Sequence, residues 1–265
     1  MAFARDAGSH VILMMGMPSA DLAELAFRAG IRSVILDAEH GFPLGPEIRA
    51  MVLAARANAG RCMVRIPPSE VDQIGFLADI GVDDIVLSGV RAVDEVGAAA
   101  ARAVFGSAGA RSLNPFVPAA GIPGDAAALH ASAAALGIWA MAETSAFVDD
   151  MARLAATAPS SRPPAWAGIV IGPYDLSTDL GCQPDPGDDR LRLAVSRLVA
   201  DAEACGLEWG LFVRDVAALR GWIEVGVHPR TVVLGYDRDL WFQACLARRN
   251  DILSLEEARQ PDGTP

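Results

Sequence analysis

Charged side chains follow four apolar runs that are typical of buried β-strands. They are Asp37 and His40 after residues 33–36, Arg65 at the end of 62–65, Glu143 after 137–142, and Asp175 after 168–171. The carboxyl ends of parallel strands meet at one edge or one mouth, so these groups are expected to lie together there. Charge without a function would be spread over helices and over both ends of the fold.

Glu143 and Asp175 follow neighbouring runs and form a credible ligand pair for a hard divalent cation. Two carboxylates with several waters suit Mg²⁺ or Mn²⁺, and Co²⁺ is also compatible with such a site. The open positions could accept the carboxylate and keto oxygens of a 2-oxo acid. The alternative is that each carboxylate caps the next helix, because Thr144 and Ser177 also look like helix starts.

Arg65 and the pair Asp37 and His40 predict the rest of a catalytic site. The Arg65 guanidinium could hold a carboxylate or the oxygen of a developing enolate, or it could form a salt bridge with a nearby acid. His40, three residues after Asp37, has the arrangement of a base that is oriented by a carboxylate. A purely structural histidine is the alternative.

The elements that must position these groups alternate regularly along the chain. The expected strands are His10–Met15, Ser33–Leu36, Cys62–Arg65, Asp84–Leu87, Gly137–Ala142, Gly168–Ile171, Glu208–Phe212 and Thr231–Leu234. An amphipathic helical pattern follows each of them, which predicts an α/β fold of the (β/α)₈ barrel type. A doubly wound open sheet would need a glycine-rich phosphate loop after the first strand, and MMGMPSA is not one. We expect one catalytic barrel over residues 10–253, an N-terminal tail at 1–9 and a polar C-terminal tail at 254–265.

The composition narrows the class of protein. A chain of 265 residues fits one barrel, and the net charge of −11 argues against nucleic acid and anionic membranes as partners. No stretch has the roughly 20 strongly apolar residues of a membrane span, and the first residues do not resemble a secretory signal. We therefore expect a cytoplasmic protein. The sequence contains no lysine, which excludes aldolase chemistry through a Schiff base.

Four segments together resemble the HpcH/HpaI aldolase family. They are LDAEHG at 36–41, VRIP at 64–67, MAET at 141–144 and GPYDLS at 172–177, and the resemblance extends from about Val11 to about Leu246. It implies a metal-dependent (β/α)₈ barrel that forms a homo-oligomer, a trimer or hexamer, with the last helix packed on a neighbouring subunit. It also implies roles for single residues: Asp37 and His40 as the proton-moving dyad, Arg65 on the enolate oxygen, Glu143 and Asp175 on the metal, and Gly172, Pro173 and Tyr174 around the pyruvate carboxylate.

Departures from the family pattern fall on the acceptor side of the site. Met141 replaces a glutamine, Ser88 replaces a proline, and the segment GARSLNPFVPAAG differs from the usual basic loop. Within that segment, Arg111 and Asn114 are expected to reach the substrate. Phe212 is expected to shape the acceptor pocket, although plain core packing is the alternative for it.

The resemblance and the residues predict an aldolase, a carbon–carbon lyase that cleaves or forms 4-hydroxy-2-oxo acids through a pyruvate-type enolate. Its partners would be a 2-oxo acid and an aldehyde or ketone acceptor. A citrate-synthase-like or other carbon–carbon bond-forming enzyme of specialised metabolism is an alternative. So is a lyase of CoA thioesters, although the strand ends carry no basic cluster for the CoA phosphates. The alternative outside enzymology is an inactive barrel that binds an oxo acid.

Overall fold

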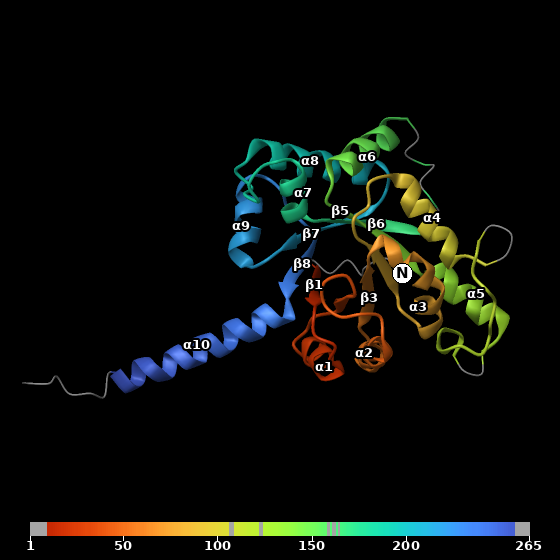
Figure 1. Cartoon of the computed structure of the whole chain (residues 1–265), viewed down its shortest axis with the longest axis horizontal. Helices are drawn as coiled ribbons and strands as arrows, with labels where there is room; N and C mark the ends of the chain where they lie inside the picture. Colours follow the sequence, from red (N-terminus) through yellow and green to blue (C-terminus); the bar gives the residue numbers. More distant parts are fainter. Residues whose placement is uncertain are drawn as a thin grey trace, which may run out of the picture.

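Eight parallel strands close, in chain order, into one barrel in the computed structural model (Figure 1). The structure describes residues 10–105, 109–121, 124–157, 160, 163 and 165–257. The strands are β1 (His10–Met15), β2 (Ser33–Asp37), β3 (Arg61–Ile66), β4 (Asp84–Leu87), β5 (Gly137–Ala142), β6 (Trp166–Ile171), β7 (Glu208–Val213) and β8 (Thr231–Tyr236). The predicted barrel is confirmed, and every predicted strand boundary lies within two residues of the observed one.

Helices connect the strands, and most of them pack on the outer face of the barrel. They are α1 (Ala20–Arg28), α2 (Pro46–Ala57), α3 (Ile74–Ile80), α4 (Val93–Ala103), α5 (Ala126–Ala135), α6 (Ser145–Thr157), α7 (Pro173–Asp179), α8 (Asp189–Ala204), α9 (Val216–Glu224) and α10 (Asp237–Glu257), with short 3₁₀ helices η1 (Pro68–Gln73) and η3 (Pro118–Ala120). The larger apolar core lies between this layer and the strands. Strands covered in this way are apolar on both faces, which explains the continuous apolar runs in the sequence.

A second apolar cluster fills the inside of the barrel. Its buried members include Ile35 on β2, Met63 on β3 and Met141 on β5. Side chains alternate along a strand, so the residue two positions later points to the same side. That rule directs the side chains of Asp37, Arg65 and Glu143 inward. They lie at the end of the barrel where the carboxyl ends of the strands meet, which we call the mouth.

Strand β8 departs from this alternation at Gly235. Its pairing with β1 runs in register to Leu13 and Leu234, and then shifts so that Met14 pairs with Tyr236. A Cβ at position 235 would lie 2.7 Å from the Arg214 carbonyl oxygen, so only glycine fits against the end of β7 there. The irregularity brings Tyr236 to the inner cluster, against which its side chain packs.

The last helix differs from the others because it extends away from the barrel (Figure 1). It continues to Glu257, four residues beyond the expected barrel boundary at 253. The expected N-terminal tail and the end of the expected C-terminal tail lie outside the described residues. Among the described helices, none is both long enough and apolar enough to cross a membrane.

Candidate active site

Three side chains at the mouth form one hydrogen-bonded unit, which we call the Asp37 cluster: Asp37, Arg65 and Tyr236. Arg65 Nε lies 2.8 Å from Asp37 Oδ1, and Arg65 Nη2 donates to the Tyr236 hydroxyl over 2.8 Å. The hydroxyl donates in turn to Asp37 Oδ2, also over 2.8 Å. The Asp37 side chain is fully buried and that of Arg65 is only 6% exposed. Such a closed ring of charge-assisted hydrogen bonds holds the guanidinium in one orientation.

The bonds within this cluster fix the charge of its members. Burial disfavours the charged form of the Asp37 carboxyl group. The hydrogen bond and the charge of Arg65, together with the hydrogen bond from the Tyr236 hydroxyl, nevertheless keep the pKa of Asp37 below its ordinary value. Burial, followed by the neighbouring Asp37, raises the pKa of the Tyr236 phenol, although Arg65 works in the opposite direction. Tyr236 is therefore a neutral donor at neutral pH, between a carboxylate and a guanidinium.

The structure does not join the side chains of Asp37 and His40 directly, as the predicted dyad would. Asp37 Oδ1 accepts hydrogen bonds from the backbone N–H of Glu39 (3.1 Å) and of His40 (3.2 Å), and no bond joins it to the imidazole in the described part of the chain. The imidazole lies at the mouth with Nε2 3.8 Å from Glu39 Oε2, and its side chain is 67% exposed. Asp37 thus positions His40 through the main chain, because its carboxylate is already occupied by Arg65 and Tyr236.

The carboxylates of Glu143 and Asp175 interact electrostatically at the mouth. Glu143 is buried at the end of β5 and its Oε1 accepts a hydrogen bond from the backbone N–H of Gly89, whereas Asp175 is exposed in α7. Burial raises the pKa of Glu143 to about 7, and the negative charges of Asp175 and Glu39 add to the effect, although the Gly89 bond opposes it. A bound cation would relieve this repulsion.

The donor set fits a cation that takes only part of its ligands from the protein. No group of three or more His, Cys, Asp or Glu side chains is arranged to hold a metal among the described residues. Glu143 Oε2 makes no hydrogen bond there, and Asp175 makes none through its carboxylate, so both can accept a cation. Mg²⁺ and Mn²⁺ commonly keep several water or substrate ligands beside one or two carboxylates.

Three aromatic rings line up across neighbouring strand ends at the mouth. Phe212 on β7 meets the Tyr174 ring edge-on at 6.1 Å and the Tyr236 ring at 6.4 Å, measured between centroids. Phe212 also packs against the inner cluster. Gly172 lies against Glu143, because a Cβ added to it would be 3.4 Å from Glu143 Oε2. The structure therefore brings Gly172, Tyr174 and Phe212 to the predicted site, together with Pro173, which is buried at the start of α7.

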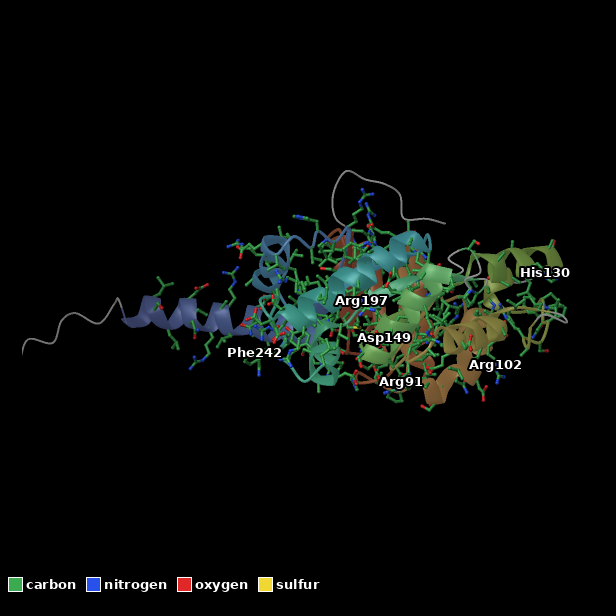
Figure 2. All side chains as sticks on the ribbon, turned by 90° about the horizontal axis from the view of Figure 1, so that it is seen from above. Arg91, Arg102, His130, Asp149, Arg197 and Phe242 are labelled. Carbon is green, nitrogen blue, oxygen red and sulfur yellow. The ribbon has the colours of Figure 1, made fainter. Side chains whose placement is uncertain are left out.

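Two predicted substrate-binding residues lie elsewhere. Arg111 Nη2 is 2.5 Å from Asp79 Oδ1, its guanidinium carbon lies 4.5 Å from the centre of the Phe105 ring, and its side chain is 2% exposed. Asn114 is exposed and accepts from the Phe116 N–H within its own loop. Arg111 and Arg102 line the same hollow. Figure 2 shows Arg102 far from Phe242, which lies near the start of α10. The structure does not bring these two residues to the mouth, because Asp79 and the Phe105 ring hold Arg111 outside the barrel; that they reach the substrate stays a prediction.

A cavity of about 560 Å³ opens at the mouth on the side of β8. Its lining residues are His40, Tyr236, Arg238, Asp239 and Phe242. Glu143, Asp175 and Arg65 do not line it, but the Tyr236 phenol joins the two regions by bonding Arg65 with its hydroxyl. Reasoning from the sequence missed Tyr236 and Arg238, and an expected strand end at Leu234 left both outside the predicted mouth.

Comparisons with known proteins show what the chain is similar to. The sequence profile of the HpcH/HpaI aldolase/citrate lyase family matches residues 11–244. A hydroxypyruvate/pyruvate aldolase of Paraburkholderia phytofirmans is 24% identical over 81% of this chain and 82% of its own length. A 4-hydroxy-2-oxo-heptane-1,7-dioate aldolase of Salmonella dublin is 24% identical over 86% of this chain and 84% of its own. Among solved structures, a citrate synthase has the same fold, with a TM-score of 0.78 at 21% identity, covering 94% of this chain and 95% of that one.

Proposed function

The chain belongs to the HpcH/HpaI aldolase/citrate lyase family and is a carbon–carbon lyase, and we propose that it cleaves and forms 4-hydroxy-2-oxo acids through a pyruvate-type enolate. The observation that carries the proposal is a buried, locked guanidinium at the same mouth as two carboxylates that interact electrostatically. Arg65 supplies the first, and Glu143 with Asp175 the second. An enolate needs positive charge at its oxygen. This mouth can supply it from the Arg65 guanidinium and from a cation held by Glu143 and Asp175.

Glu143 and Asp175 would hold a divalent cation, Mg²⁺, Mn²⁺ or Co²⁺. When bound, such a cation supplies Lewis-acid stabilisation of the enolate charge and orients the oxo acid. Gly172 brings backbone next to Glu143, which supports a place for the substrate carboxylate around Gly172, Pro173 and Tyr174.

Arg65 stabilises the oxygen that becomes negative. Its Nε and Nη2 bond Asp37 and Tyr236, whereas Nη1 lies 3.1 Å from Glu39 Oε2 and a weak 3.5 Å from Met141 Sδ. The donor directed at Met141 can therefore pass to a substrate oxygen without loss of a strong bond. A sulfur is a poor acceptor, so its replacement by an enolate oxygen favours the reacting state.

His40 handles the proton of the substrate hydroxyl. Its imidazole lines the cavity and is exposed to an incoming acceptor. In cleavage, it takes the proton from the C4 hydroxyl, the C3–C4 bond breaks, and the electron pair moves to the C2 oxygen that Arg65 holds. A proton then returns to C3, which gives the 2-oxo acid, and the other product leaves as an aldehyde or ketone.

The test is exchange of the pyruvate methyl protons with D₂O, followed by NMR, with Mg²⁺, Mn²⁺ or Co²⁺ and then with a chelator. We expect exchange that depends on the cation and is lost in Glu143→Gln and in Arg65→Gln. Glu24→Gln makes the same change on the exposed face of α1 and should leave exchange intact. Absence of exchange with every cation would reject pyruvate as the enolate donor and would favour a thioester substrate or a role in binding alone.

The described part of α10 also supports a homo-oligomer. Trp241 is 63% exposed, Phe242 58% and Ile252 58% on a helix of 21 residues that leaves the barrel (Figure 1). A long helix with exposed large apolar side chains needs a partner, and we propose a second copy of this chain, in a trimer or hexamer. Light scattering after gel filtration should give a multiple of 27.7 kDa that falls in Trp241→Ser/Ile252→Ser and stays in Leu193→Ser, a matched change on α8. A monomeric wild-type protein would refute the assembly.

A further inference from the structure

Arg111 is a buried cation outside the barrel whose hydrogen-bonding capacity is only partly used. Its side chain is 2% exposed, and its guanidinium carbon lies 4.5 Å from the centre of the Phe105 ring. Its Nη2 is 2.5 Å from Asp79 Oδ1, whereas Nε and Nη1 are buried without a hydrogen-bond partner in the part of the chain that the structure describes. A buried donor that stays unpaired costs about 1–3 kcal/mol. This guanidinium therefore favours the binding of a further acceptor.

The bond from Asp79 uses only half of one edge of the guanidinium. In this planar group, Nε–H and one N–H of Nη2 lie side by side and point the same way, which matches the two oxygens of a carboxylate. Asp79 occupies the Nη2 position and leaves Nε of Arg111 empty. The Asp79 side chain is already 27% exposed, so it can turn to solvent and give way to a carboxylate that takes both positions.

A hollow of about 260 Å³ on the outer side of the barrel gives access to this edge. Arg111 and Asp79 line it, together with Phe76, which is 53% exposed and forms an apolar wall. Arg102 and Asp72 also line it and form an ion pair of 2.8 Å. The cavity at the mouth shares none of these residues, and the hollow is large enough for a small organic molecule.

We infer that this hollow is a second, non-catalytic binding site, for a small organic acid with one carboxylate and an apolar part. The carboxylate takes the Nε and Nη2 edge of Arg111, and the apolar part lies on Phe76. Asp72 and Asp79 balance the two guanidinium groups of the hollow, so its formal charge is zero and suits one added negative charge. A phosphate dianion would add a second charge against the same two carboxylates and has no apolar part. The site goes beyond the proposed function and does not depend on it.

The test uses butanoate as the probe, with butanamide as its uncharged counterpart and inorganic phosphate as the other anion. Calorimetry on the full chain, at constant ionic strength and with a chelator, measures binding without a cation at the mouth. We expect a Kd of about 1 mM for butanoate and binding at least about 10-fold weaker for the other two ligands. Arg65→Gln removes the buried guanidinium at the mouth and should leave this Kd unchanged. Loss of binding in that variant would place the acid at the mouth and overturn the inference.

Substitutions in the hollow should change the affinity for butanoate in opposite directions. Arg111→Gln should raise the Kd about 10-fold or more, the effect of one charge-assisted hydrogen bond. Asp79→Asn removes the charge that competes with the ligand and should lower the Kd about 3- to 10-fold. An Arg111–Asp79 ion pair with a purely structural role would give no such rise in affinity. Arg28→Gln, a matched change in the exposed ion pair with Glu24 on α1, should leave the Kd as in the wild-type protein.

Gly75→Leu tests the hollow while Arg111 stays in place. Gly75 lines the hollow, and a Cβ there would lie 3.8 Å from Arg111 Cγ, an ordinary van der Waals contact, so a larger side chain can be added and should block binding. Thermal melting shows which variants are folded, and this one keeps the test valid if Arg111→Gln does not fold. The inference would be overturned by no binding of butanoate up to about 20 mM, by equal or tighter binding of butanamide or phosphate, or by an unchanged Kd in a folded Gly75→Leu variant.

Discussion

Tyr236→Phe removes one hydroxyl group from the centre of the Asp37 cluster and leaves the ring in place. The hydroxyl donates to Asp37 Oδ2 and accepts from Arg65 Nη2, each over 2.8 Å. In the variant, a fully buried carboxylate oxygen loses the one side-chain donor that it has among the described residues, and the guanidinium loses one of the bonds that orient it. Both the stability of the fold and the chemistry at Arg65 should therefore change.

The losses of stability and of activity can both be estimated from the bonds of the hydroxyl group. A hydrogen bond to a charged group contributes about 1.5–3 kcal/mol, and loss of one partner of a buried pair has a cost in that range. At about 2 kcal/mol, the melting temperature of a protein of this size should fall by about 4–8 °C. If the loss of orientation at Arg65 removes about the same free energy from the transition state, kcat/KM should fall about 10- to 100-fold.

The pH dependence has a definite sign. The pKa of Asp37 is lowered in the folded protein, so its contribution to stability is present above the unfolded-state value of about 3.9 and is lost as the pH falls through the folded-state value. Loss of the Tyr236 donor should raise the folded-state pKa toward the ordinary value and reduce that contribution. Acid unfolding of Tyr236→Phe should consequently begin at a higher pH than that of the wild-type protein.

The assay combines thermal and acid melts with steady-state kinetics of aldol cleavage. Tyr174→Phe is the matched control for the melts, because the Tyr174 hydroxyl makes no hydrogen bond in the described part of the chain and its loss should leave the melting temperature unchanged. A folded Tyr236→Phe variant with wild-type melting temperature and with kcat/KM within about twofold of wild type would refute the role assigned to the cluster.

Two further predictions concern single positions. Because the pKa of Glu143 is about 7, cation binding at pH 7 should release about half a proton, and the affinity for the cation should rise from pH 6 to 8. Titration calorimetry in two buffers of different ionisation enthalpy measures the proton release. No release would argue against Glu143 as a ligand. Gly168→Ala would place a Cβ 2.5 Å from a backbone oxygen and should destabilise the fold by about 1–3 kcal/mol. Gly97→Ala lies inside α4 with its nearest neighbour at 3.4 Å and should stabilise the fold by about 0.5–1 kcal/mol. Equal denaturation midpoints for the two variants would refute the difference.

Much of the mouth was predictable because side chains alternate along a strand. Ile35, Met63 and Met141 are apolar and inward, so the charged residue two positions later in each strand must reach the mouth. The type of residue at those positions, and their placement at strand ends, carries the chemistry. Partnerships between the side chains were less predictable, because Asp37 has several donors within reach and sequence spacing favours His40 without showing that Arg65 occupies the same oxygen.

Tyr236 shows where alternation fails and why. Continued from Val233, which faces inward, the regular pattern would direct Gly235 into the barrel and Tyr236 outward. The close approach of the Arg214 backbone to Gly235 and the register shift against Met14 reverse this, and both depend on contacts between strands that are far apart in the sequence. Helix α10 begins directly after Tyr236, and the guanidinium of its Arg238 bonds the Gly16 carbonyl oxygen. The glycine at the end of β8 thus accounts for the phenol at Arg65, a feature of this mouth that sequence spacing did not predict.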